Sequence, residues 1–209
     1  MLQKILNGKS EVWQRHFPTA SSGAQLFSEF EERAKAVSAE VFRCATAADA
    51  REALIRLVEG ALVQKAVVVE SPLQIAAGVT EALRARGVEV YTDPAEIADH
   101  APTADIGISG VEFGVAETGS VFQEGREIAT RLVTILPPLH VVFLPSANIV
   151  PGIAEAFEII SESFDRGYIG FITGPSRTAD IERVLTIGVH GPSRFAIIAV
   201  DEEPKGGVA

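Results

Sequence analysis

The chain has 209 residues, of which 47% are hydrophobic and 22% are charged; this composition is typical of a globular domain and excludes a disordered or low-complexity chain. Asp and Glu total 28 against 18 Lys and Arg, so the formal net charge is −10, which argues against nucleic-acid binding because an acidic chain repels a phosphate backbone. The apolar runs are too short to span a bilayer or to form a signal peptide, so we expect a cytoplasmic protein with no membrane insertion.

Cys44 is the only cysteine of the chain. One thiol can form no intrachain disulfide and cannot hold an iron–sulfur cluster or a cysteine-only zinc ion. The glycine-rich fingerprints of dinucleotide and nucleoside triphosphate sites are also missing, as is a paired histidine spacing. The residues therefore predict no cofactor or metal site, and any redox chemistry has to come from a partner or from a bound cofactor.

The first 60 residues are predicted to be mainly helical. Residues 1–23 are irregular in character, whereas residues 24–43 carry apolar side chains at helical spacing. A second helix is predicted over 46–59, with Thr46 as its N-cap and Asp49 as the capping-box partner. We expect this segment to pack on the body of the protein.

After residue 60 short apolar runs alternate with helical patterns. Strands are predicted at 66–69, 88–91 and 104–109, and helices at 73–86 and from Asp93-Pro94. Such alternation is typical of an α/β fold with a mostly parallel sheet between helices.

The second half is less regular. It reads as a strand–turn–strand over 111–122, an apolar segment at 131–136, strands at 140–144, 168–173 and 195–200, and a helix at 153–164. Because no linker divides this region, we expect a single α/β domain over 61–201, preceded by the helical segment 1–60 and followed by a polar tail at 202–209.

Glu117 lies in a turn of small residues at 114–120. Small residues let a ligand approach the main chain, and a carboxylate in such a turn can act as a base or a nucleophile. A tight hairpin with Glu117 in solvent at its tip is the alternative.

A glycine-bounded loop at 174–182 follows a predicted strand and leads into a predicted short helix. The free amides of that helix, with Ser176, Arg177 and Thr178, would suit an anion. The alternative is ordinary helix capping, with Asp180 complementing the helix dipole.

His190 stands in a third glycine-rich loop, immediately before Gly191. A histidine there can lie in a cleft and titrate near neutrality, although it can equally hydrogen-bond the main chain. Glu117 and His190 are thus the candidate catalytic residues, and we expect the three loops to converge on one cleft at the strand ends. The candidate anion-binding residues are Thr118, Gly119, Gly174, Ser176, Arg177 and Thr178.

Three runs together carry a family resemblance: ADIGISGVEFGVAETGS at 104–120, LPPLHVVFLPSANIV at 136–150 and GPSRTADIERVLTIGVHGP at 174–192. In order and spacing the chain resembles the lactate-utilization protein C family, also called the LUD domain, over roughly 60–200. The resemblance implies the fold of phosphosugar isomerases and CoA transferases. It also implies a component that acts with two iron–sulfur proteins in the oxidation of L-lactate to pyruvate.

Two other functions stay open at this point, and the residues do not decide whether the chain is itself an enzyme. It could be a free-standing enzyme on a small anionic metabolite such as a CoA thioester or a sugar phosphate, with Arg177 holding the anion and Glu117 or His190 as base. It could also be a binding module that senses such a metabolite without turnover.

Overall fold

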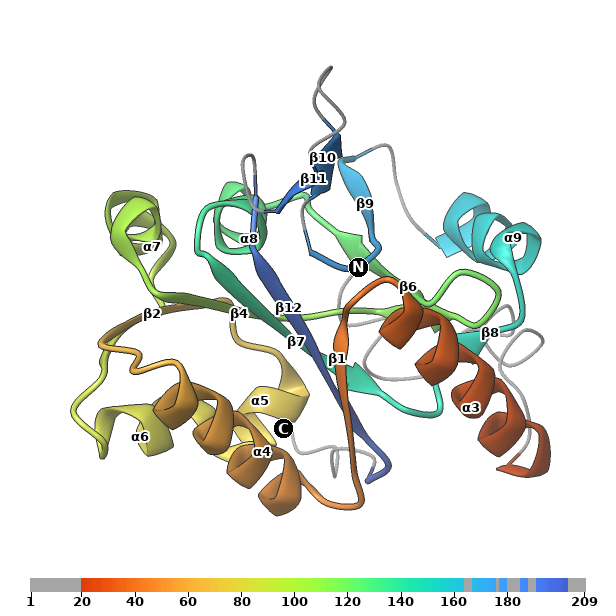
Figure 1. Cartoon of the computed structure of the whole chain (residues 1–209), viewed down its shortest axis with the longest axis horizontal. Coiled ribbons are helices and arrows are strands. Elements are labelled where there is room, and N and C mark those ends of the chain that lie inside the picture. The colour runs from red at the N-terminus through yellow and green to blue at the C-terminus, as the bar shows by residue number, and fades with distance from the viewer. Residues whose placement is uncertain (1–19, 164–166, 176, 180–184, 188–190, 203–209) are drawn as a thin grey trace.

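The computed structural model describes residues 20–163, 167–175, 177–179, 185–187 and 191–202. A large sheet lies at the centre of the molecule, helices cover both of its faces, and a smaller sheet packs against one face (Figure 1).

The large sheet has six strands in the order β1-β12-β7-β4-β2-β3, and every neighbouring pair is parallel. Its strands are β1 (Glu40–Cys44), β12 (Arg194–Val200), β7 (Leu139–Pro145), β4 (Ile106–Gly110), β2 (Lys65–Val68) and β3 (Glu89–Tyr91). The predicted α/β fold with a mostly parallel sheet is confirmed.

The small sheet has the order β8-β5-β6-β9. Its strands are β8 (Ile149–Val150), β5 (Phe113–Val115), β6 (Ser120–Glu124) and β9 (Ile169–Ile172). Strands β5 and β6 form an antiparallel hairpin, which confirms the predicted strand–turn–strand. A separate antiparallel pair joins β10 (Arg177–Ala179) and β11 (Leu185–Ile187).

The described helices divide between the two faces of the large sheet (Figure 1). One face carries α4 (Ala47–Gly60), α5 (Pro72–Ala77) and α6 (Val79–Arg84). The other face carries the small sheet with α3 (Ala20–Ala36), α7 (Pro94–His100), the short 3-10 helix η1 (Ala101–Thr103) and α8 (Ile128–Ile135). The remaining helix, α9 (Ile153–Ser163), packs on the outer side of the small sheet.

Strand β7 shows why the large sheet is buried on both faces. Val141 and Phe143 join the core under α4, whereas the alternate residues Val142 and Leu144 join the core under α3. A strand that is covered on both faces is apolar at successive positions, as this one is in the sequence. The polar exception is His140, which lies on the α3 face with no exposed surface.

Two predicted helix starts are confirmed at the level of single hydrogen bonds. The Asp49 amide donates to Thr46 Oγ1 at 3.1 Å and the Thr46 amide donates to Asp49 Oδ2 at 3.1 Å, which is the complete capping box of α4. Asp93 caps α7 by accepting from the Ala95 amide at 2.9 Å.

The helix predicted over 24–43 is wrong beyond Ala36. Helix α3 ends at Ala36, Ser38 takes a left-handed φ of 70°, and residues 40–44 form β1, which pairs in parallel with β12. The reason is tertiary, because Val41 and Phe42 pack on opposite faces of the sheet edge. The helix predicted over 73–86 is also interrupted, at Gly78 with a φ of 63°.

Candidate functional site

A pocket of about 280 Å³ lies between the small sheet, helix α8 and the residues that precede β12. The described residues that line it come from β6, α8, β9 and the loops at their ends: Gln123, Gly125, Arg131, Thr134, Ile135, Tyr168, Gly170, Phe171, Ile172, Thr173, Gly174, Gly191 and Pro192. This size is at the lower end of the range for sites that hold small organic ligands.

Two of the three glycine-rich loops meet at this pocket. Gly174 follows β9 and Gly191 precedes β12, and both contribute to its wall. The loop after Glu117 lies next to them, because Ser120 Oγ and Thr173 Oγ1 are 2.7 Å apart. Within the large sheet the pocket lies near the amino ends of β7 and β12, since Ile135 and Pro192 precede those strands.

Helix α3 holds two of these loops in place. Gly119 has a φ of 66° and Gly174 a φ of 75°, conformations that glycine adopts without strain. A Cβ at Gly119 would overlap the backbone of Ala34, and a Cβ at Gly174 would overlap the carbonyl oxygen of Val37. Both predicted anion-binding glycines therefore allow a close approach to the end of α3.

Arg131 is the cationic residue among those that line the pocket. Its guanidinium carbon lies 5.2 Å from the centroid of the Tyr168 ring, a cation–π contact. No carboxylate among the described residues forms an ion pair with it. Gly125 makes room for this stack, because a Cβ there would lie 2.6 Å from the Tyr168 ring. The pocket thus carries a positive charge that a small anion can neutralise.

A buried chain of hydrogen bonds runs from the pocket to the large sheet. Thr134 Oγ1 donates to Gln123 Oε1 at 2.7 Å, and Gln123 Nε2 donates to Ser109 Oγ and to the Gly110 carbonyl, both at 2.8 Å. Ser109 Oγ lies 2.9 Å from His140 Nε2. These contacts fix the Gln123 side chain rigidly, because both of its amide hydrogens and its oxygen are engaged.

His140 terminates this chain in the interior. Its buried Nδ1 has no hydrogen-bond partner among the described residues, and burial lowers the pKa of the imidazole from 6.5 to about 3. The ring is therefore neutral at physiological pH, because charging it in this apolar layer costs free energy. The sequence signal for this network is His140, a polar residue inside the apolar strand β7. Gln123 carries no such signal, because β6 contains other polar residues. Neither residue is among the predicted site residues.

Glu117 lies elsewhere. Its Oε2 accepts a hydrogen bond from the Ile153 amide at 3.0 Å, at the start of α9, and its side chain is not among those that line the pocket. An exposed carboxylate at a helix start satisfies a free amide and complements the helix dipole.

We expect Glu117→Ala to lower the free energy of unfolding by about 1 kcal/mol, because the Ile153 amide loses its partner. Glu117→Gln keeps an acceptor oxygen and should lose less. Urea denaturation followed by circular dichroism compares the two variants with the parent chain. Equal losses in both variants would contradict the capping role.

Of the remaining predicted site residues, some are placed by the structure and others fall outside the described residues. Thr118 lies in the turn between β5 and β6, where its hydroxyl accepts from the Ser120 amide at 3.3 Å. Ser176 and His190 fall outside the described residues. Within the loop predicted over 174–182, Arg177 and Thr178 belong to strand β10, which pairs with β11. The short helix predicted to follow Thr178 falls on residues 180–184, outside the described residues.

Among the described residues, no helix combines the length and the hydropathy that a bilayer crossing requires. No group of three or more His, Cys, Asp and Glu side chains among these residues is arranged to hold a metal ion.

The fold and the pocket define a mostly parallel α/β domain with a glycine-edged pocket beside its central sheet. The LUD domain family model matches residues 27–200, and the chain belongs to this family; the predicted resemblance is confirmed. The fold is also similar to the crystal structure of a DUF162 family protein from Deinococcus radiodurans. The TM-score is 0.60 at 18% identity, and the match covers 88% of this chain and 99% of that one.

Curated relatives share a name that bears on function. The chain is 38% identical over 109 residues to "Lactate utilization protein C" of Geobacillus thermodenitrificans, covering 50% of this chain and 45% of the relative. Proteins of the same name from Bacillus subtilis (37% over 107 residues, 49% and 45%) and Halalkalibacterium halodurans (34% over 132 residues, 60% and 57%) are similar as well. The chain spans about half the length of the curated relatives it matches.

Proposed function

We propose that this chain is a cytoplasmic component of an L-lactate utilization system, in which it supports oxidation of L-lactate to pyruvate together with iron–sulfur partner proteins. The observation that carries the proposal is membership of the LUD domain family together with the similarity to relatives named for lactate utilization. The iron–sulfur partners enter the proposal because the family resemblance of the sequence implies them.

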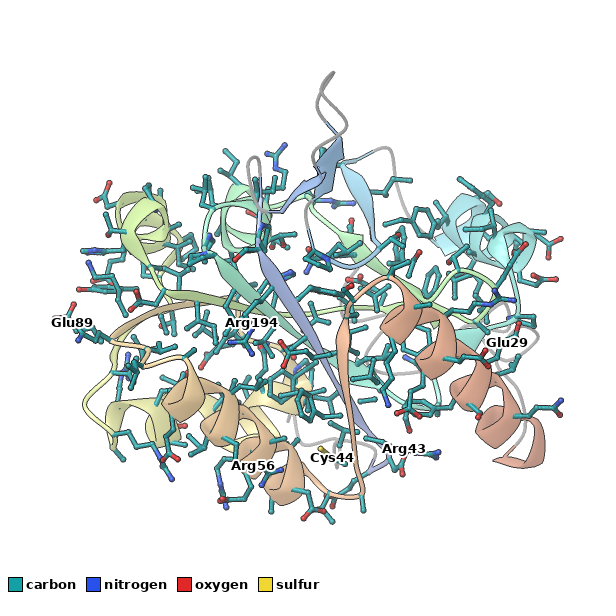
Figure 2. All side chains as sticks on the ribbon, in the orientation of Figure 1. Glu29, Arg43, Cys44, Arg56, Glu89 and Arg194 are labelled. Atoms are coloured by element: carbon teal, nitrogen blue, oxygen red, sulfur yellow. The ribbon has the colours of Figure 1, made fainter. Side chains whose placement is uncertain are left out.

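The electron balance of the proposed reaction requires an electron acceptor. Oxidation of L-lactate to pyruvate releases two electrons and two protons. Cys44, the only cysteine, is 5% exposed at the end of β1, close to Arg43 (Figure 2). Burial and the nearby Asp49 raise the pKa of its thiol, so it is a poor thiolate ligand. One buried thiol cannot hold a cysteine-ligated cluster, which supports placing the cluster on a partner protein.

The test is lactate-dependent electron transfer in a reconstituted system. The two iron–sulfur proteins that the family resemblance implies are purified from the source of this chain, and reduction of an artificial acceptor by L-lactate is measured with and without the chain. We expect reduction only when all three proteins are present. Full activity of the two partners alone would reject the proposal.

A second candidate function rests on Arg131, which forms no ion pair with an acidic side chain in the part of the chain that the structure describes. The isolated chain is then an enzyme or a binding module for a small anionic metabolite, such as a CoA thioester or a sugar phosphate. Ligand binding raises the melting temperature by mass action. Saturable stabilisation by one of these compounds that disappears in Arg131→Gln would favour this function over the first.

A further inference from the structure

We propose that the pocket binds a small carboxylate that carries a hydroxyl group, and that it binds this hydroxy acid in preference to the corresponding oxo acid. The proposal rests on the proposed function in one respect, since L-lactate and pyruvate are such a pair. It adds the residues that form the site and the direction of its selectivity.

The carboxylate end of the ligand is assigned to Arg131. Its guanidinium stacks on Tyr168, which orients it, and it has no acidic partner among the described residues. A guanidinium presents five N–H donors in a planar fork that matches the two oxygens of a carboxylate. Its side chain is partly buried, so the charge is less screened than on an open surface.

The hydroxyl end of the ligand is assigned to Gln123. The hydrogen-bond partners of its side chain determine which amide atom is the nitrogen and which is the oxygen. The Gly110 carbonyl can only accept, so the Gln123 atom 2.8 Å from it is the nitrogen. The second amide hydrogen goes to Ser109 Oγ at 2.8 Å. No donor is left on this side chain, and what it offers to a ligand is the second lone pair of Oε1.

Thr134 is an acceptor for the same reason. Its hydroxyl has one hydrogen, which is shared between Gln123 Oε1 at 2.7 Å and the Thr130 carbonyl at 2.8 Å. Only lone pairs remain. Gln123 and Thr134 therefore present only acceptors to the pocket, and a ligand group that contacts both side chains has to donate a hydrogen bond. A hydroxyl group can donate to these oxygens. A ketone oxygen only accepts, so it would leave the oxygens of Gln123 and Thr134 without a donor.

The spacing of the two ends suits a small ligand. Arg131 and Thr134 are three residues apart on α8, so their Cβ atoms lie on one face of the helix within about 5–6 Å. A carboxylate and a hydroxyl on adjacent carbons can reach both. The volume of about 280 Å³ leaves room for a side chain longer than the methyl group of lactate.

The experiment is isothermal titration calorimetry on the full 209-residue chain with two matched pairs. The pairs are L-lactate with pyruvate, and 2-hydroxyisocaproate with 4-methyl-2-oxopentanoate. We expect each hydroxy acid to bind about tenfold more tightly than its oxo acid, or better. Thr134→Val should reduce this ratio by about threefold or more, whereas Thr134→Ser should keep it.

Arg131→Gln should weaken binding of the hydroxy acids by about tenfold or more. Arg126→Gln is the matched control, because Arg126 pairs with Glu124 at 3.2 Å and does not line the pocket. Equal binding of the paired acids, tighter binding of the oxo acid, no binding of any of the four, or an unaffected Arg131→Gln would each overturn the inference.

These outcomes are separable from a failure of the proposed function. A chain that binds neither hydroxy acid and is still required for lactate-dependent electron transfer contradicts the site alone. A chain that selects hydroxy acids and is dispensable for electron transfer contradicts the role in lactate oxidation alone.

Discussion

Gly119→Ala is expected to lower the free energy of unfolding by about 3 kcal/mol, because the added methyl group has no space. A Cβ at this position would overlap the Ala34 nitrogen and lie 2.5 Å from the carbonyl carbon of Arg33. Both atoms belong to the backbone of α3, which cannot move aside as a flexible side chain can. The variant also strains a left-handed φ of 66°. Urea denaturation followed by circular dichroism measures the loss.

Gly87→Ala is the matched control for this effect. Gly87 has a similar φ of 78°, but a Cβ there would meet no atom within 4 Å. The control therefore pays only for the left-handed backbone, about 1 kcal/mol. If Gly119→Ala lowers the free energy of unfolding no more than Gly87→Ala does, close packing of α3 on the hairpin is not the reason for glycine at position 119. Its backbone conformation alone would then explain it.

The part of the fold that could be predicted from the sequence is the part in which local signals and tertiary packing agree. Thr46 and Asp49 mark the start of α4 because a capping box acts within four residues of the chain. The apolar run of β7 predicts a strand covered on both faces because each side chain from Leu139 to Leu144 is buried on one face or the other.

The end of α3 could not be predicted in this way. Val37 and Val41 continue the helical spacing, but Val41 and Phe42 also suit a strand with two apolar faces. Pairing with β12 stabilises residues 40–44 as a strand. The turn before this strand uses a left-handed backbone at Ser38, where a glycine would have indicated the end of the helix in the sequence.

The candidate site was predicted in part, for a comparable reason. Gly174 and Gly191 mark two loops that reach the pocket, because glycine is used where backbones turn or approach closely. Arg131 and Thr134 were not found, since they lie in a short apolar helix whose contact with β6 is decided by the tertiary fold. The turn of small residues predicts a functional role for Glu117, whereas its observed partner is the start of α9, more than thirty residues away.

The pH dependence of stability is expected to show two limbs, set by two groups with opposite pKa shifts. Burial lowers the pKa of His140 from 6.5 to about 3. Between these two pH values the unfolded chain therefore binds a proton at this position and the folded chain does not, so stability falls as the pH drops through this window.

Burial raises the pKa of Glu112 from 4.5 to about 8, against the opposing effect of its hydrogen bond from the Glu124 amide. The folded chain here holds a proton that the unfolded chain has released, so stability falls as the pH rises through that window.

The two effects cancel where their windows overlap, between pH 4.5 and 6.5, because folded and unfolded chains then bind the same number of protons at these two sites. Below pH 4.5 only the His140 effect remains, and above pH 6.5 only the Glu112 effect. Each has a limiting slope of about 1.4 kcal/mol per pH unit, or about 2 kcal/mol over its limb. The free energy of unfolding should therefore form a plateau between two descending limbs in urea titrations from pH 3 to pH 8.

Single variants assign the limbs, because other carboxylates also contribute at acidic pH. Glu112→Gln keeps an acceptor for the Glu124 amide and removes the titration, so the loss above pH 6.5 should disappear while the acid limb stays. His140→Gln should flatten the acid limb, whatever its constant cost to the buried contact with Ser109, because a neutral amide binds no proton in either state. The quantity to compare is the slope with pH and not the stability at one pH, since a packing defect shifts the whole curve and leaves its shape unchanged. A Glu112→Gln curve parallel to that of the parent chain would show that the Glu112 carboxyl is ionised in the folded protein and reaches solvent.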